Sequence, residues 1–257
     1  MTGPDPPAPT TGVADAEPVT AASPRPVRRP VMLQHWNDIT WLHWAHDPDR
    51  VQALLPPQVR VDTFGGQAWV GLVPFRMTRL RPPGLPAVPW LTTFPEINVR
   101  TYVVAPDGRR AVWFWSLDAP RAPAIAMARL AFGLPYFWAD AAVERCGDRI
   151  DYRASRRRPH APAATRIAVA AGEPVAAGAT TDLEHFLTAR FGLLTVRRGR
   201  LVHGAVDHPP WPLRRGRLVD LEDGLVAAAG LPAPVDEPLV HVADGVPVRV
   251  GRLRPAG

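Results

Sequence analysis

The sequence predicts an α+β protein in which a large, curled antiparallel β-sheet carries a few short flanking helices. Three observations predict this class. Short apolar runs with period-2 alternation recur from residue 59 onward. Thirty-two prolines work against long helices and central strands. Helix start and stop signals occur in only three segments. A β-rich chain of this kind is best explained by one sheet curled around a cavity.

Residues 1–30 differ in composition from the rest of the 257-residue chain. They are rich in Pro, Ala and Thr and nearly lack aromatic and large aliphatic side chains. Such a stretch buries too little apolar surface to fold, so we expect a disordered tail over 1–30 and a single domain over 31–254. No run has the pattern of a signal peptide or a membrane span, which predicts a cytoplasmic protein without membrane contact.

Helix signals mark three segments. The first has Asp47 as its N-cap and Pro48 at the first helical position. The second is rich in small residues and is stopped by Gly133. In the third, Thr181 and Glu184 have the spacing of a capping box. We therefore expect helices at 47–55, 122–133 and 182–191.

The remaining periodic runs are interpreted as strands separated by turns. The run Val112–Trp115 is apolar on both faces, which is typical of a central strand covered on both sides. The expected strands are 59–64, 67–75, 97–104, 110–117, 141–145, 149–153, 164–170, 193–197, 200–206, 216–221 and 246–252.

The run Phe94–Val103 alternates most clearly. Glu96, Asn98 and Arg100 share one face of this strand, because strand side chains alternate with period 2. Glu96 and Arg100 lie about 13 Å apart at about 3.3 Å per residue, so they cannot easily pair with each other. Such a row is the wall of a wet cavity or a salt-bridged outer face, and the tryptophans on either side favour the cavity.

Other candidate sites give weaker signals. His35, His43 and His46 could gather near Asp38, but they lack tight metal-ligand spacing, and half-buried histidines are the simpler interpretation. The single cysteine, Cys146, allows no internal disulfide and no cysteine metal site. The run 208–212 is either a rigid loop that closes over a site or a surface turn.

The chain has a net charge of +6 but contains no lysine, so no side chain can form a Schiff base with a carbonyl substrate. Arginine clusters could indicate a nucleic-acid partner, yet they are dispersed and sit beside turns, so solvated arginines are favoured. The clusters are 156–158, 197–200 and 214–217.

From Leu33 onward the chain resembles the YqjF-like family, a domain of unknown function named DUF2071. No activity comes with this resemblance. It is carried, over about residues 31–214, by stretches in a fixed order: 35–36, 94–103, 116–119, 128–136, 186–191 and 208–213.

The family in turn resembles the acetoacetate decarboxylase superfamily, which implies a β-cone or barrel around an apolar cavity. In that enzyme a glutamate precedes a Gly-x-Pro-Lys-Lys motif by roughly forty residues. Glu96 is similar to the glutamate, and Gly133–Phe137 is similar to the motif, with Tyr136 and Phe137 in place of both lysines. The resemblance therefore implies a retained pocket without the decarboxylase chemistry.

We expect a small-molecule-binding protein, with no cofactor and no metal, that acts on a small organic acid or carbonyl compound. Glu96 would be the base and Tyr136 the acid or oxyanion donor. Asn98, Arg100 and Arg129 would bind the substrate. A binding or sensor module without catalysis is the alternative, a nucleic-acid-binding protein is a weaker one, and the oligomeric state stays open.

Overall fold

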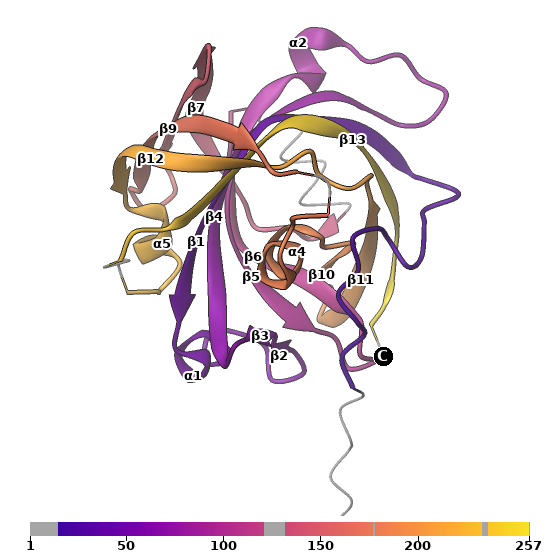
Figure 1. Ribbon diagram of the computed structural model, residues 1–257. Helices are drawn as coiled ribbons and strands as arrows, with labels where there is room; N and C mark the ends of the chain where they lie inside the picture. Colours follow the sequence, from indigo (N-terminus) through magenta and orange to yellow (C-terminus); the bar gives the residue numbers. More distant parts are fainter. Residues whose placement is uncertain (1–14, 121–131, 177, 233–235, 257) are drawn as a thin grey trace, which may run out of the picture.

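Thirteen strands of the described chain join into one sheet that curls into a ring-like shape (Figure 1). The computed structural model describes residues 15–120, 132–176, 178–232 and 236–256. Its strands are β1 Met32–His46, β2 Arg60–Val61, β3 Thr63–Phe64, β4 Gln67–Arg81, β5 Phe94–Val104, β6 Arg110–Ala119, β7 Tyr136–Cys146, β8 Arg149–Arg156, β9 Ala164–Pro174, β10 Gly192–Arg197, β11 Arg200–Asp207, β12 Arg214–Asp223 and β13 Leu239–Pro255. The predicted fold class, a large curled sheet with few short helices, is confirmed.

Five strands form a shared wall in the order β13-β1-β4-β5-β6, and the sheet forks at both ends of this wall. On one side the chain closes through β7, β8, β9 and β12, and on the other through β10 and β11. β6 therefore pairs with β7 near Leu117 and with β10 near Val112, along the edge that does not face β5. Each lobe thus has its own interior, with the wall between them.

The sheet is mostly antiparallel, as predicted, but it is mixed, because two of the described strand pairs are parallel. β6 runs parallel to both β7 and β10, while the other pairings are antiparallel. Parallel neighbours need a long crossover connection, and the distance along the chain from Ala119 to Tyr136 meets this requirement. Strand periodicity carries no information on relative strand direction, so the residues alone could not reveal this.

The two faces of β5 belong to different interiors, as its alternation predicts. Ile97 and Val99 pack into a dry cluster with side chains of β7, β8 and β9, such as Ile150. Glu96 and Arg100 turn to the opposite side and line a cavity. The bulge between Val99 and Arg100 in the β5–β6 register does not disturb this division.

Four short helices accompany the sheet within the described part of the chain, with bounds α1 Pro48–Gln52, α2 Pro89–Thr92, α4 Asp182–Thr188 and α5 Leu225–Ala228. Asp47 caps α1 through the Asp49 amide, and the capping box of Thr181 and Glu184 is present at α4, as predicted. α4 ends at Thr188 instead of 191, because the chain turns there to enter β10 at Gly192. Most of the helix predicted over 122–133 lies outside the described residues.

α4 sits inside the curl of the sheet (Figure 1). Phe186 and Leu187 on this helix pack with Tyr102 of β5 and Val112 of β6 in one buried cluster. The helix therefore packs inside the second lobe, against the wall and Leu193 of β10.

The strand β1 was absent from the prediction. Its middle is buried on both faces, with Ile39, Thr40, Trp41 and Leu42 all at most 2% exposed. A strand covered on both sides shows no alternation, so its histidines and tryptophans resembled a ligand cluster instead. β1 pairs with both β4 and β13 inside the wall.

The segment 15–30 departs from the predicted disordered tail. The Glu17 amide donates to the Gly108 carbonyl, and the Val27 amide donates to Asp207 at 3.1 Å. Val27 is buried, since it is only 7% exposed. These contacts hold the segment against the domain, while residues 1–14 lie outside the described ones.

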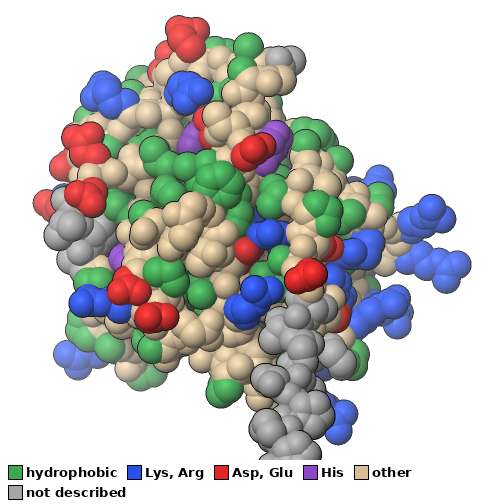
Figure 2. All heavy atoms as spheres, turned by 60° about the horizontal axis from the view of Figure 1, so that its bottom comes forward, with side chains coloured by type: hydrophobic (Ala, Val, Ile, Leu, Met, Phe, Trp, Pro, Cys, Tyr) green, Lys and Arg blue, Asp and Glu red, His purple; other side chains and the backbone are tan. Residues whose placement is uncertain are grey.

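Charged side chains of both signs are scattered among hydrophobic side chains on the molecular face shown in Figure 2. Within the described ranges, no helix has the length and apolar character needed to cross a membrane. The same ranges contain no cluster of three His, Cys, Asp or Glu side chains that could hold a metal ion.

Candidate active site

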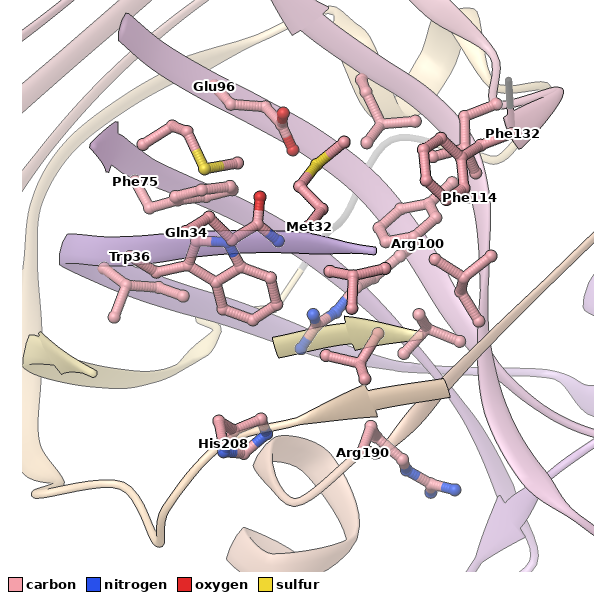
Figure 3. A pocket seen from close by; sticks show the side chains of 18 of the residues that line it. Met32, Gln34, Trp36, Phe75, Glu96, Arg100, Phe114, Phe132, Arg190 and His208 are labelled. Carbon is pink, nitrogen blue, oxygen red and sulfur yellow. The ribbon is translucent and has the colours of Figure 1, made fainter. Parts of the chain in front are cut away.

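A cavity of about 120 Å³ lies in the second lobe, between the wall and the strands β10 and β11. Its surface is mostly apolar, with two methionines, several phenylalanines and three tryptophans (Figure 3). A few polar side chains interrupt this surface at separate places: Gln34, Glu96, Arg100, Tyr136, Thr188, Arg190 and His208. A largely apolar concavity with few polar groups is typical of a small-molecule site.

Glu96 and Tyr136 meet on the cavity surface. The Tyr136 hydroxyl donates to Glu96 Oε2 at 2.8 Å, although the two residues lie on β5 and β7, with β6 between them. Glu96 is only 3% exposed. The sequence-predicted pair of catalytic candidates is therefore brought together in one place.

Burial changes the proton affinity of both groups. Desolvation raises the pKa of Glu96 from 4.5 to about 7, against the hydrogen bonds from Tyr136 and Asn98, which lower it. Burial and the nearby Glu96 carboxylate raise the pKa of Tyr136 well above its usual value. Near neutral pH, Glu96 is thus divided between both protonation states, while Tyr136 remains a neutral phenol.

Asn98 is buried and is not among the residues that line the cavity. Its side chain hydrogen-bonds to Glu96, and its Oδ1 is buried without a hydrogen-bond partner among the described residues. The structure therefore places Asn98 where it can position Glu96. Its contact with substrate stays a prediction.

Arg100 lines the cavity at a different place from Glu96. Its side chain is buried, yet none of the described carboxylates lies within 4.0 Å of it. Its Nη2 reaches the Tyr102 hydroxyl and the Leu187 carbonyl only at 3.5 Å, and its Nε has no partner. A buried guanidinium with so few contacts is available for an anion.

Arg129, the third predicted substrate-binding residue, lies outside the described residues. The structure adds Arg190, which follows α4 and lines the cavity. Arg190 donates from Nη1 to Asp62 at 2.7 Å and from Nε to the Phe186 carbonyl at 2.8 Å. The sequence gives one signal for Arg190, because it directly follows a helix with a clear N-cap. Its ion-pair partner Asp62 could not be identified in this way, because it is remote in sequence.

The run 208–212 closes over the cavity instead of forming a simple surface turn. His208 and Trp211 both line the cavity. Trp211 stacks on Trp36 with ring centroids 6.1 Å apart, and it meets the edge of Trp41 at 4.7 Å. The prolines around Trp211 restrict the backbone and hold this aromatic group in place.

The candidate histidine ligands of β1 do not converge. His43 Nε2 contacts the Tyr102 hydroxyl at 2.6 Å, and burial lowers its pKa well below the usual value. Asp38 instead forms ion pairs with Arg76 and Arg145. These residues thus have separate structural partners.

The residues 33–247 match a family model, DUF2071, described as an uncharacterized conserved protein. The uncharacterized protein YqjF of Bacillus subtilis (strain 168) is 38% identical over 216 residues, which is 83% of this chain and 87% of that protein. Both comparisons include Glu96, Arg100 and Tyr136 within the matched range of the chain.

Solved structures show a similar fold at low sequence identity. An acetoacetate decarboxylase-like enzyme from Sphingomonas wittichii RW1 has a TM-score of 0.61 at 15% identity, covering 88% of this chain and 93% of that one. The enduracididine biosynthesis enzyme MppR complexed with pyruvate also has a TM-score of 0.61 at 15% identity, covering 89% and 91%. Acetoacetate decarboxylase from Legionella pneumophila has a TM-score of 0.57 at 15% identity, covering 90% and 92%. With its curled sheet, its apolar cavity and these relatives, the chain belongs to the YqjF-like DUF2071 family and has the acetoacetate decarboxylase-like fold.

Proposed function

We propose that this protein binds a small organic acid or carbonyl compound in the cavity and acts on it by acid–base chemistry without a Schiff base. One observation carries the proposal: Glu96, buried on an apolar cavity wall with its pKa raised to about 7, is hydrogen-bonded to Tyr136. Groups with strongly shifted pKa values in a cavity are candidates for catalysis. The absence of lysine from the sequence excludes a lysine Schiff base.

The two groups suit proton transfer next to a carbonyl. The Glu96 carboxylate takes a proton from the carbon beside the carbonyl, and the C–H bonding electrons move onto the carbonyl oxygen to form an enolate. Tyr136, held as a neutral phenol, then turns its O–H to that oxygen and stabilises the negative charge. Protonated Glu96 returns the proton to the same or a neighbouring atom, which completes an isomerisation or exchange.

The solved relatives guide the choice of first probes. One of them is described as complexed with pyruvate and others as acetoacetate decarboxylases, which concern those proteins alone. They support oxo acids and ketones as a starting panel for this chain. The location that we propose is the cytoplasm, because the exposed free thiol of Cys146 persists in a reducing compartment.

Deuterium exchange tests the proposal directly. Full-length protein is incubated in D₂O with pyruvate, 2-octanone or 7-oxooctanoate, and proton NMR follows loss of the signals beside each carbonyl. We expect catalysed exchange for at least one probe, reduced about a hundredfold or more by Glu96→Gln and about tenfold by Tyr136→Phe. Arg153→Met, an exposed change on β8, is the matched control and should exchange like the wild type.

Two outcomes would overturn the catalytic roles. One is exchange at the wild-type rate in both variants. The other is tight binding of a probe that native mass spectrometry recovers unchanged, with no exchange in any variant, which would establish a binding or sensor module instead.

The arginine clusters give little support to a nucleic-acid partner. Arg156 is bound to Asp118, Arg157 to Asp140 and Arg214 to Asp148. Their charges are thus already compensated by neighbouring carboxylates. Binding to nucleic acid that weakens steeply between 50 and 200 mM salt would contradict this interpretation, because phosphate contacts release counterions.

A further inference from the structure

We infer that the cavity takes an elongated organic anion, whose carboxylate binds Arg100 and whose carbonyl lies, several bonds away, at Glu96 and Tyr136. The carbonyl end of this inference rests on the proposed function. The carboxylate end rests on separate observations of Arg100 and its surroundings.

Arg100 is a cation that the described protein leaves without a counterion. It is 7% exposed, and the guanidinium contacts only neutral groups at the limit of hydrogen bonding. Burying an uncompensated charge is strongly unfavourable, so its presence indicates an anion that comes from outside the chain. A guanidinium binds a carboxylate through two parallel hydrogen bonds, which suits this ligand class.

The surroundings of Arg100 add positive charge. Arg190, which also lines the cavity, shares the single carboxylate of Asp62 with Arg110. Burial is the main cause that lowers the pKa values of His43 and His208, and the positive charge of Arg100 lowers them further. This part of the cavity therefore favours an anion and disfavours a second cation.

Two tryptophans that line the cavity also carry buried hydrogen-bond donors. The indole Nε1 atoms of Trp36 and Trp41 have no acceptor among the described residues, like the Nε of Arg100. Unsatisfied buried donors are unfavourable unless a ligand or water accepts from them.

The spacing of the two ends determines the shape of the ligand. Glu96 and Arg100 are four residues apart on β5, which separates their Cα atoms by about 13 Å. Figure 3 shows their side chains at separate places on the cavity surface, with Met32 and Gln34 labelled between them in this view. A 2-oxo acid such as pyruvate has adjacent carboxylate and carbonyl groups and cannot reach both ends.

The cavity has room for more than a single water. One water needs at least about 10–15 Å³ on this measure, and the cavity of about 120 Å³ exceeds that several-fold. The unbranched oxo acid 7-oxooctanoate is a suitable probe, because it has a carboxylate at one end, a methyl ketone at the other and an apolar chain between.

Calorimetric titration of the full-length protein tests the carboxylate end. The probes are 7-oxooctanoate, its methyl ester, which lacks the charge, and pyruvate, which lacks the length. We expect the wild type to bind the acid about tenfold to a hundredfold more tightly than the ester, and also more tightly than pyruvate. Arg100→Met and Arg100→Gln should both abolish the preference for the acid over the ester, while Arg153→Met should retain it.

The inference is overturned if the wild type binds the acid and the ester equally, or if pyruvate binds as tightly as 7-oxooctanoate. It is also overturned if both Arg100 variants, shown to be folded by circular dichroism, retain the preference for the acid.

The Glu96→Gln variant separates this inference from the proposed function. We expect it to keep the preference for the acid over the ester but to lose deuterium exchange beside the ketone. Unchanged exchange in this variant refutes the base role and leaves the carboxylate site standing. If instead the wild type shows no preference for the acid over the ester, the carboxylate site at Arg100 is refuted, and the base role of Glu96 is left standing.

Discussion

Two sets of buried charges lie on the neighbouring strands β5 and β6, and they differ in how they are compensated. On β6, Asp118 accepts from Arg156 Nε at 2.6 Å and from Nη2 at 3.1 Å, and both side chains are at most 5% exposed. On β5, Glu96 and Arg100 are about as deeply buried, but neither has an opposite charge within 4.0 Å among the described residues. Burial alone therefore does not distinguish the scaffold from the site, whereas pairing does.

The largest expected change in stability follows from breaking the ion pair between Arg156 and Asp118. Arg156→Met leaves the Asp118 carboxylate buried and unpaired, which should lower the free energy of unfolding by about 3–5 kcal/mol. Urea denaturation measures this change. The exposed neighbour Arg153 on the same strand provides the control, since Arg153→Met should change stability by less than about 0.5 kcal/mol. If Arg156→Met lowered the free energy of unfolding by less than about 1 kcal/mol, the paired and unpaired buried charges would not differ in their effect on stability.

Glu96 should make stability fall as pH rises. The unfolded chain ionises Glu96 near its ordinary pKa of 4.5, while the folded protein retains the proton until about 7. The folded state therefore binds more protons in this window, and the unfolding free energy decreases from pH 4.5 to 7 by at most about 3 kcal/mol. Above pH 7 the decrease is complete.

Glu96→Gln removes this titration, so its stability advantage over the wild type should grow between pH 5 and pH 8. Urea denaturation of both proteins at the two pH values measures the difference. Parallel pH dependence of the two proteins would show that Glu96 is ordinary in its proton affinity.

Arg100→Met should not lower the free energy of unfolding, in contrast to Arg156→Met. Removing a buried cation that has no counterion should leave stability unchanged or raise it by up to about 2 kcal/mol. The same urea titration measures it. A clear destabilisation would mean that Arg100 has a structural role, and the two sets of charges would then be alike.

Tyr136→Phe should have the smallest effect, which is a modest rise in the pKa of Glu96. The phenol hydrogen bond lowers the pKa of Glu96, so its loss should move that pKa upward from about 7 by at most about one pH unit. NMR titration of ¹³C-labelled glutamate locates the midpoint. An unchanged midpoint would show that the hydrogen bond does not tune Glu96.

The wall strand that carries the site could be predicted because its own residues specify it. The alternation of Glu96 and Arg100 with Ile97 and Val99 reports two different environments on two faces of one strand. Local signals also located α4, because Thr181 and Glu184 form their capping box within one helical turn. The meeting of Tyr136 with Glu96 was expected only from the family resemblance, since no local rule joins β5 to β7.

Features that depend on distant partners could not be predicted. Arg190 is defined by Asp62, which lies more than a hundred residues away in the chain. Trp36 and Trp41 acquire their place in the cavity from Trp211 and from the pairing of β1 with β4 and β13. Sequence periodicity describes the environment of a side chain, but it does not identify the neighbour that creates this environment.

The pairing of β1 with β13 has a kinetic consequence for the cavity. β1 supplies Trp36, Ile39 and Trp41 to the lining, and it is held in the sheet by a strand that begins at Leu239. Pairing across such a sequence separation requires a large loop to close first, which makes folding slow. We therefore expect the cavity to be the last part of the molecule to become ordered, after the local hairpins β7–β8 and β10–β11 have formed.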